Sequence, residues 1–584
     1  MLPPLYKMAH YTQCAADPSN YYCSAQAELI VPSTNLNMVN MLKNISLDIS
    51  RFDRKFIYRT LCIPKRFIKD DFELNSYSSY LVNEEIEPFR LSAKVEDTTC
   101  NKIKLEMNAY DIIFLILVIV YNVLVIFATY KGKIYEKEQG FKKTISKLSL
   151  FHTWKIRSRI PDTTDFKNLL NVNGTRVLAM LYIICLHLFL IYHGTFISDP
   201  ETFEHLLYTF TEYIIGYSAM YMVLHFFLIS SWLLTIQVYN IHEKRQLTLK
   251  NIGILIINRY FRLNFSIFAL MIFSVTSFAT RLAGPANFYA VISNQKACNE
   301  NWFASLFFFA NFYRLGDICN VVTWHVSADF QLYVINLFLL YIKLKYKFND
   351  IKFFATVLIF SMFLHGMVLQ IFDADPIYPP VPRYCELHYW YSSLNFVVSY
   401  MSPASIWPST LIGIIFGLVY IKTKNVNIKA SVILNTIWCV TTLGLIYLSV
   451  RMGSVKINGV KRSMLGPIIK PLFCLGCAIG VYGMSHNLGG PVKKLMESKI
   501  FVVLSNFVYG IYLTHFLFLV LINKFNTEPI YINLWKMVQD YIISVILSLL
   551  FGIYFTLIVE EPGNMLQKKI LPQITKWEKI SKTN

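Results

Sequence analysis

About eleven apolar runs, each near the twenty residues that a helix needs to cross a bilayer, limit the possible folds of this chain most strongly. A helix rises about 1.5 Å per residue, so such a run spans the roughly 30 Å of membrane hydrocarbon. The sequence therefore predicts an all-α polytopic membrane protein with about eleven transmembrane helices and a small N-terminal extracytoplasmic domain. The runs are 110–130, 176–196, 213–237, 263–280, 326–342, 353–372, 406–422, 430–450, 467–484, 501–523 and 537–559.

The composition agrees with a membrane protein. Hydrophobic residues make up 55% of the 584 residues and charged residues only 16%, which leaves too little polar surface for a soluble globule of this size. The formal net charge of +19 could suit nucleic acid, but the Lys and Arg residues lie in short segments between apolar runs. We therefore expect the membrane as a partner and no nucleic acid.

The basic residues also predict an orientation. With the N-terminus outside the cytoplasm, about three quarters of the Lys and Arg residues after the first run fall in cytoplasmic segments. The segment Lys131–Arg159 contributes most, whereas the loop Arg451–Arg462 places four cations on the opposite side. The positive-inside rule thus predicts an extracytoplasmic N-terminus and a cytoplasmic C-terminus, in the plasma membrane or the endoplasmic reticulum.

The runs and loops divide the chain into five parts. Residues 1–109 would form an N-terminal cysteine-bearing domain, 110–130 the first transmembrane helix and 131–170 a basic cytoplasmic linker. Residues 171–571 would form the main transmembrane domain, and 572–584 a cytoplasmic tail. The cysteines of the first part indicate an oxidising compartment, although no signal peptide is visible and the sequence leaves open whether one is missing.

A glycosylation sequon and two pairs of cysteines allow further predictions about the sides of the membrane and about metal binding. A glycosylation sequon at Asn44 lies in the part expected outside the cytoplasm. In a later extracytoplasmic loop, Cys298 and Cys319 stand 21 residues apart, and we expect a disulfide there in preference to two free thiols. Cys474 and Cys477 form a CxxC inside an apolar run without further ligands, so we expect no metal site.

Ionisable residues in the apolar runs are candidate functional residues, because charge inside a bilayer is costly. Arg176 and His187 are eleven residues apart, about three helical turns, and so share one helix face with His187 near mid-membrane. A neutral imidazole there can take a proton from a hydroxyl or an amine. The alternative is that His187 only bonds a neighbouring helix.

Two more clusters allow a functional and a structural interpretation. Arg259 and Arg262, at i and i+3, would lie at the cytoplasmic start of the fourth span, where they could bind a polyphosphate or anchor the helix at the lipid headgroups. His325, Asp329 and Tyr333 follow at i, i+4 and i+8 on the fifth span. This polar column could orient an acceptor hydroxyl or seal a helix interface.

Several fragments follow one another in the order of a known family. Gly174, Arg176 and His187 match a Gly-x-Arg that is followed eleven residues later by His. The further fragments are Phe226-Phe227 with Ser230 and Leu233, Arg259 with Arg262, Thr323 to Tyr333, Leu411-Ile412-Gly413 with Gly417, Tyr512-Leu513-Thr514-His515, and Glu560-Glu561-Pro562. Over nearly its whole length the chain resembles membrane acyltransferase family 3, in the animal branch of the nose resistant to fluoxetine proteins.

The chain departs from this family at several positions. Leu224 stands where the family has a carboxylate that could support an imidazolium, and Ile406 stands near the position of a missing arginine. Ser231 replaces a glycine, His325 replaces a tyrosine, and the N-terminal C-x-P-x-x-C keeps its first cysteine, Cys62, but not its second. The sequence leaves open whether catalysis survives these changes.

The resemblance implies an acyltransferase that moves an acyl group from a cytoplasmic acyl-CoA to a hydroxyl or amine on a lipid or another small apolar acceptor. Acyl-CoA would be a co-substrate, and no cofactor would be bound permanently. The catalytic residues would be His187, Ser230 and Asp329. The residues that bind the acyl-CoA phosphates would be Arg176, Arg259 and Arg262. The alternative is a non-catalytic lipid carrier or transporter on the same fold.

Overall fold

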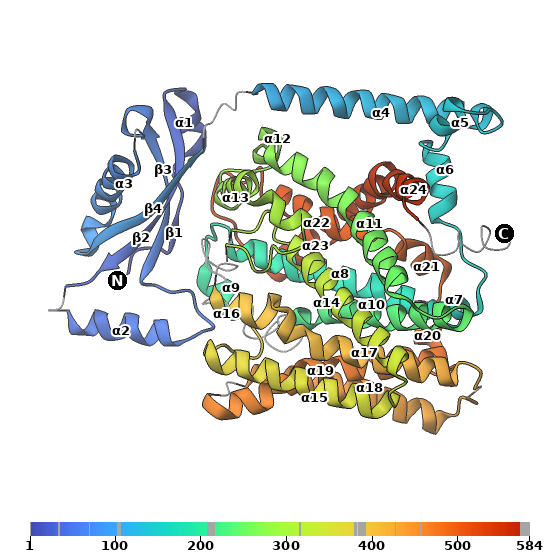
Figure 1. Cartoon of the computed structure of the whole chain (residues 1–584). Coiled ribbons are helices and arrows are strands. Elements are labelled where there is room, and N and C mark those ends of the chain that lie inside the picture. The colour runs from blue at the N-terminus through green and yellow to red at the C-terminus, as the bar shows by residue number, and fades with distance from the viewer. Residues whose placement is uncertain are drawn as a thin grey trace.

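The computed structural model shows a small N-terminal domain at one end of a larger helical domain, with the long helix α4 connecting the two (Figure 1). The predicted tail at 572–584 lies outside the described residues beyond its first position, as do the first residues of the predicted span 213–237. The described residues are 2–32, 35–68, 70–101, 107–206, 217–314, 317–378, 382, 393–426, 428–455 and 458–572.

A four-stranded sheet in the order β1-β3-β2-β4 forms the core of the N-terminal domain. Strand β2 pairs antiparallel with β3 and β4, whereas β1 pairs parallel with β3. Alternate residues of β2, Cys23, Ala25 and Ala27, share one buried cluster with residues of helix α3, because successive strand side chains point to opposite faces. The elements are β1 (Tyr6–Lys7), α1 (Tyr11–Ala16), β2 (Asn20–Ile30), α2 (Leu36–Leu47), β3 (Phe56–Pro64), α3 (Asp71–Ile86) and β4 (Ser92–Asn101), with 3-10 turns at Lys65–Phe67 and Glu87–Phe89.

Three disulfides lie in the described part of the chain, and the predicted one between Cys298 and Cys319 is confirmed. It connects α13 (Phe288–Leu306) to the segment that precedes α14. The other two cross-link the N-terminal domain, and the cysteine left from the partial family motif takes part in one of them. They are Cys14–Cys62 and Cys23–Cys100.

The predicted number of membrane spans is confirmed. Within the described ranges, ten helices are long and apolar enough to cross a membrane, or up to eleven if one bent pair forms a further span. Helices α15, α17, α18 and α19 pack together on one side of the domain (Figure 1). The long helices are α4 (Ala109–Tyr135), α8 (Leu170–His193), α10 (Tyr217–Lys244), α11 (Leu249–Val275), α14 (Thr323–Tyr346), α15 (Asp350–Ile371), α17 (Pro403–Thr423), α18 (Val432–Ser454), α19 (Gly459–Ser485) and α23 (Leu534–Phe555).

Shorter elements connect or extend these spans. Helix α17 continues α16 (Leu394–Phe396) through a π-helix at Val397–Met401, and α23 continues into α24 (Glu561–Ile570) through a π-helix at Thr556–Glu560. The basic linker predicted at 131–170 contains three short helices. The remaining short helices are α5 (Phe141–Ser146), α6 (Leu150–Arg157), α7 (Thr164–Asn168), α9 (Pro200–Leu206), α12 (Ser277–Thr280) and α20 (Gly490–Met496).

The span predicted at 501–523 is not continuous. Helices α21 (Lys499–Ser505) and α22 (Val508–Ile522) meet there at a bend of 76°. At the bend, Arg157 Nη1 donates to the Asn506 carbonyl at 3.3 Å, and the Asn506 side chain donates to the Arg157 carbonyl at 2.8 Å. Arg157 thereby supplies partners for backbone groups that a helix end leaves free.

Helix α11 begins at Leu249, well before the predicted start of its span near residue 263. The Thr248 side chain caps it by accepting a hydrogen bond from the Asn251 amide at 3.3 Å. Arg259 and Arg262 therefore lie about 15 to 20 Å along the helix axis from its start.

Helix α4 is mostly exposed along its apolar length, and it is held near its two ends and at its middle, where the Tyr121 hydroxyl donates to the Ile558 carbonyl at 2.5 Å. At its first turn the Asp111 carboxylate accepts hydrogen bonds from the Ser277 amide at 2.8 Å and the Ser277 hydroxyl at 2.7 Å. Beyond its last turn, α6 places Arg157 in ion pairs with Glu560 at 2.6 Å and Glu561 at 2.5 Å. The helix is thus a tether whose attachment points lie on opposite sides of the helical domain.

The N-terminal domain docks where α8 ends. The ring of Phe52 lies 6.2 Å from that of Phe203, and the Glu204 carboxylate accepts from the Phe52 amide at 2.8 Å. Arg54 pairs with the same carboxylate at 3.1 Å. Burial raises the pKa of Glu204, although Arg54 opposes the shift. The docking therefore rests on a buried carboxylate that is bound twice by one loop.

Replacing Glu204 with Ala should loosen this docking, because removing one partner of a buried ion pair costs about 3–5 kcal/mol. Hydrogen–deuterium exchange of the full chain should show faster exchange at residues 52–58. The control is Glu300→Ala, which removes an exposed ion pair with Arg314 and should leave that segment unchanged. Equal exchange in Glu204→Ala and the wild type would contradict the docking role.

Candidate functional site

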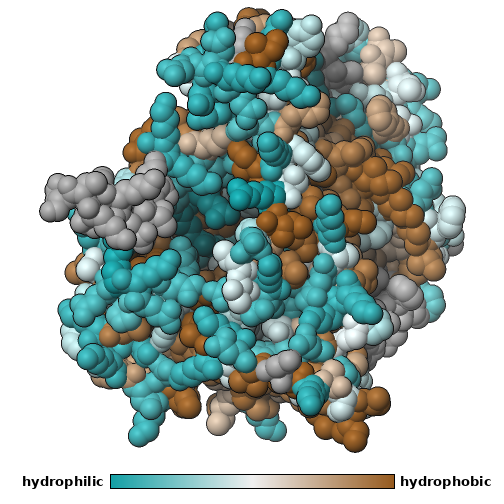
Figure 2. All heavy atoms as spheres, turned by 90° about the vertical axis from the view of Figure 1, so that its right-hand side faces the viewer, coloured by the Kyte–Doolittle hydropathy of each residue, from teal (hydrophilic) through white to brown (hydrophobic). Residues whose placement is uncertain are grey.

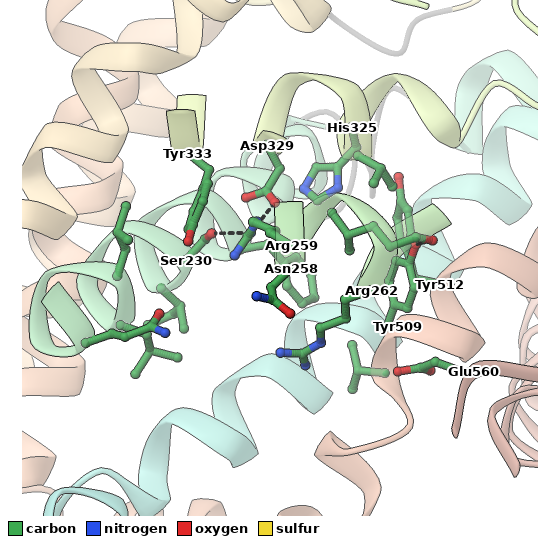
Figure 3. A pocket seen from close by; sticks show the side chains of 18 of the residues that line it. Ser230, Asn258, Arg259, Arg262, His325, Asp329, Tyr333, Tyr509, Tyr512 and Glu560 are labelled. Atoms are coloured by element: carbon green, nitrogen blue, oxygen red, sulfur yellow. Dashed lines mark hydrogen bonds and ion pairs between the residues drawn. The ribbon is translucent and has the colours of Figure 1, made fainter. Parts of the chain in front are cut away.

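A pocket of about 470 Å³ lies among α8, α10, α11, α14, α22 and the α23–α24 junction (Figure 3). Its size is typical of small-molecule sites, and it combines apolar walls with a few polar groups. The apolar lining includes Phe226, Ile229, Leu233, Leu255 and Val508, and the polar lining includes Arg176, Ser230, Arg259, Arg262, His325, Asp329, Tyr333, Tyr509, Tyr512 and Glu560.

The pocket extends inward from the end of the molecule that lies opposite the N-terminal domain. Figure 2 looks onto this end, which hydrophilic side chains mostly cover and which is hollowed left of its centre. The lining residues Gln567 and Lys568 come from the last turns of α24. At the inner end, near the start of α14, the Tyr512 hydroxyl donates to the Val322 carbonyl at 2.8 Å. The pocket is therefore bounded by Tyr512 on the side toward the N-terminal domain.

Arg259 joins three helices inside the pocket. Its Nη2 donates to Asp329 Oδ2 at 2.5 Å and to Ser230 Oγ at 3.0 Å, and its guanidinium lies 4.2 Å from the centre of the Tyr333 ring. Figure 3 shows these four side chains grouped on one side of the pocket. The structure thus brings together Ser230, Arg259 and Asp329, which the sequence predicted as site residues from three separate spans.

Arg176 and Arg262 line the same pocket but differ from Arg259 in their contacts. Within the described residues, neither has a hydrogen-bond or ion-pair partner. Glu560 also lines the pocket, but its carboxylate is bound by Arg157 at 2.6 Å. Two guanidinium groups are therefore available for an anionic ligand, and phosphate oxygens suit them because each guanidinium can donate two parallel hydrogen bonds.

Helix α8, which carries Arg176, can pack closely against α20 because residue 174 is a glycine. A Cβ built on Gly174 would lie 2.2 Å from the Met496 carbonyl oxygen, so any side chain there would push α8 away from α20. On the next turn, the His225 ring on α10 lies 3.0 Å from Thr175 Oγ1. These two contacts hold Arg176 in the wall of the pocket.

His187, the predicted base, does not line the pocket. Its Nδ1 lies 2.6 Å from His515 Nε2, and His515 Nδ1 lies 2.6 Å from the Tyr512 carbonyl oxygen. A carbonyl only accepts, so His515 carries its proton on Nδ1, and in the neutral pair His187 Nδ1 donates to His515 Nε2. The lone pair of His187 is then on Nε2, and Tyr512 stands between the histidine pair and the pocket.

Sequence reasoning did not nominate some of the residues that shape the site. His515 and Tyr512 belong to the fragment Tyr512-Leu513-Thr514-His515, and Glu560 belongs to Glu560-Glu561-Pro562; both fragments were visible as family motifs. For Arg157, the sequence indicated no role beyond its place in a basic segment. Two of the departures from the family pattern, Leu224 and Ile406, are buried and are not among the lining residues, whereas a third, His325, lines the pocket.

Comparison with known proteins shows to which family the chain belongs. A family model described as an acyltransferase domain matches residues 169–558, which include most of the pocket lining. The chain belongs to membrane acyltransferase family 3. The predicted animal branch is also confirmed: this acyltransferase homologue is 25% identical over 337 residues to nose resistant to fluoxetine protein 6 of Caenorhabditis elegans.

The similarity is partial along both chains. The aligned region covers 53% of this acyltransferase homologue and 39% of the worm relative, so the chain spans less than half of that relative's length. No solved structure matches.

Removing either partner of the Arg259–Asp329 pair should destabilise the helical domain by about 3 kcal/mol, because the other charge would stay buried without compensation. Thermal unfolding in detergent should show lower midpoints for Arg259→Ala and for Asp329→Ala. The double variant Arg259→Met, Asp329→Leu should recover most of the loss, since it leaves no unpaired charge. A double variant no more stable than the single ones would contradict this account of the pair.

Proposed function

We propose that this protein transfers an acyl group from acyl-CoA to a hydroxyl or amine on a lipid or another small apolar acceptor. The observation that carries the proposal is the pocket in which Arg176 and Arg262 have no hydrogen-bond or ion-pair partner among the described residues, while Arg259 is bonded to Asp329 and Ser230. Family membership supports the same class of reaction.

The arginines and the apolar walls of the pocket suit the two parts of an acyl-CoA, its phosphates and its acyl chain. Arg176 and Arg262 would bind its phosphates, because both keep their charge at any physiological pH and can bind phosphate oxygens in pairs. The apolar walls formed by Phe226, Ile229 and Leu233 would take the acyl chain. Acyl-CoA would enter and leave as a co-substrate.

The Arg259–Asp329–Ser230 cluster would stand beside the thioester. Asp329 holds the Arg259 guanidinium, which in turn holds the Ser230 hydroxyl at 3.0 Å. A positive group fixed in this way can stabilise the oxyanion that forms when the acceptor attacks the thioester carbonyl. His187 would act as a positioning residue, through His515 and Tyr512, because it does not reach the pocket itself.

The predicted orientation places the pocket toward the cytoplasm, where acyl-CoA would be supplied. All three described disulfides lie at the end of the molecule that carries the N-terminal domain; the Tyr22 ring of that domain lies 5.8 Å from Phe288 of α13. Disulfides persist in oxidising compartments, so this end suits the extracytoplasmic side. The pocket opens at the other end.

A non-catalytic lipid carrier is the second candidate. Two observations favour it: Leu224 stands where the family has a carboxylate, and His187 lies behind Tyr512, outside the pocket. A carrier would use the same cavity and the same arginines for a lipid phosphate. The two candidates differ in whether a thioester bond is broken.

Purified full-length protein in lipid nanodiscs should release CoA thiol from acetyl-CoA or palmitoyl-CoA when total membrane lipid is the acceptor. Arg262→Ala should raise the donor KM about ten- to a hundredfold, the equivalent of one charge-assisted contact of about 1.5–3 kcal/mol. His187→Ala should lower kcat and leave the donor KM unchanged. Radiolabelled donors would identify the acylated product.

The matched control is Arg314→Ala, which removes an arginine at the other end of the molecule and should leave KM unchanged. Absence of thiol release with both donors, combined with saturable binding of palmitoyl-CoA or phospholipid, would support the carrier instead.

Asn44 gives an independent test of the orientation. The residue is exposed on α2, and the sequon serine, Ser46, donates to Asp53 at 2.8 Å. Peptide N-glycosidase should increase the electrophoretic mobility of the protein from eukaryotic cells, and Asn44→Gln should abolish that change. A change that Asn173→Gln abolishes instead would place the pocket end outside the cytoplasm.

A further inference from the structure

His325 is the one histidine among the described residues that line the pocket. It lies two residues after the start of α14, at the inner end, where Figure 3 shows it beside Asp329. Its Nε2 is buried and has no hydrogen-bond partner in the described part of the chain. Because the buried Nε2 is closed to a ligand in the pocket, the ring nitrogen that can meet a ligand is Nδ1, which also has no hydrogen-bond partner among the described residues.

Aromatic side chains hold the ring of His325 in place. The ring centre lies 4.6 Å from that of Phe227 and 5.2 Å from that of Tyr512, and Trp324 stands nearly perpendicular to it at 5.8 Å. Contacts from both sides restrict rotation of the imidazole. Its nitrogens therefore point in fixed directions, as a group that must meet a reacting atom requires.

The charged and polar groups around His325 come from three helices. Asp329 lies one turn later on the same helix, Arg259 faces it from α11, and Tyr512 faces it from α22; α10 contributes the rings of Phe226 and Phe227. Because Arg259 is paired with Asp329, its positive charge is largely compensated. A proton on His325 then has a carboxylate nearby, as an imidazolium formed during catalysis needs.

The other two histidines of the site face elsewhere. His187 and His515 are bonded to each other on the far side of Tyr512, and neither lines the pocket. An acceptor hydroxyl that reaches a thioester in the pocket therefore meets His325 before it can meet His187.

We propose that His325 is the catalytic base of this chain, and that its Nδ1 takes the proton from the acceptor hydroxyl. The inference rests on the proposed acyl transfer. The acceptor oxygen forms a bond to the thioester carbonyl carbon as its proton passes to Nδ1, and the carbonyl electrons move to an oxyanion beside Arg259. When the oxyanion collapses, the carbon–sulfur bond breaks and the proton on His325 passes to the leaving thiolate, so that an ester and CoA thiol result.

The test compares three histidine variants of the full-length protein in nanodiscs, with acetyl-CoA, palmitoyl-CoA and total membrane lipid. His325→Gln should lower kcat about 10²- to 10⁴-fold, the range for loss of a general base, and should change the donor KM less than about threefold. Added imidazole should restore part of the rate to His325→Ala. The control, His486→Ala, removes a histidine outside the pocket and should keep the wild-type rate.

The pH profile separates a base from a structural residue. Wild-type kcat/KM should fall as pH drops and the base becomes protonated. This decline should disappear in His325→Gln and persist, at a lower rate overall, in His187→Ala. Wild type and His325→Gln should bind a non-hydrolysable thioether analogue of palmitoyl-CoA equally well, which would show that the variant is folded. If His325→Gln does not fold, His325→Tyr takes its place in the test, because it keeps a ring in the same space.

Wild-type rates in His325→Gln, or an unchanged acid decline, would overturn the assignment while leaving acyl transfer intact. A wild-type protein that breaks no thioester would overturn the proposed function, and the base with it.

Discussion

The ion pair between Arg259 and Asp329 is the constraint on which the helical domain depends. A guanidinium placed some 15 Å along α11 from its start needs a partner, because charge in a low-dielectric interior is expensive unless it is compensated. The partner comes from α14, and Ser230 on α10 accepts a second bond from the same nitrogen. Three helices are thereby held at one level of the membrane domain. The pocket occupies the space beside them, and its two other arginines are left to its ligand.

Much of this arrangement could be predicted from the sequence. The apolar runs give the number of spans, the polar clusters at Arg259 and Asp329 point to two of the site residues, and the family fragment adds Ser230. The start of α11 could not be predicted from the apolar run expected near residue 263, because the helix begins at Leu249, where the Thr248 side chain caps it.

Other features depend on contacts between distant parts of the chain. The bend between α21 and α22 is satisfied by Arg157, which is some 350 residues earlier in the sequence. The His187–His515 pair spans a similar separation, so neither residue reveals the other through local spacing. The sheet of the N-terminal domain did have a local pattern, the alternating Cys23, Ala25 and Ala27, but no strands are predicted there because the long apolar runs that follow dominate the pattern of the chain.

The departures from the family pattern are better understood with the pocket in view. Leu224 and Ile406 are buried among apolar side chains and do not line it. The groups that face the ligand, namely the arginines, Asp329, Ser230 and His325, are in place. Under the proposed mechanism, the carboxylate close to the base His325 is Asp329, one turn later on the same helix, so Leu224 does not deprive this base of a carboxylate.

Helix α4 bears on how such a protein can evolve. It bonds to the helical domain near its start through Asp111, at its middle through Tyr121 and Asn122, and beyond its last turn through Arg157, and the stretch that matches the acyltransferase family begins only after it, at residue 169. The N-terminal domain adds buried contacts of its own, because Phe52 belongs to the same core cluster as residues of α8. Residues outside the matched stretch are thus packed against residues within it, so changes on the two sides of these contacts would have to occur together.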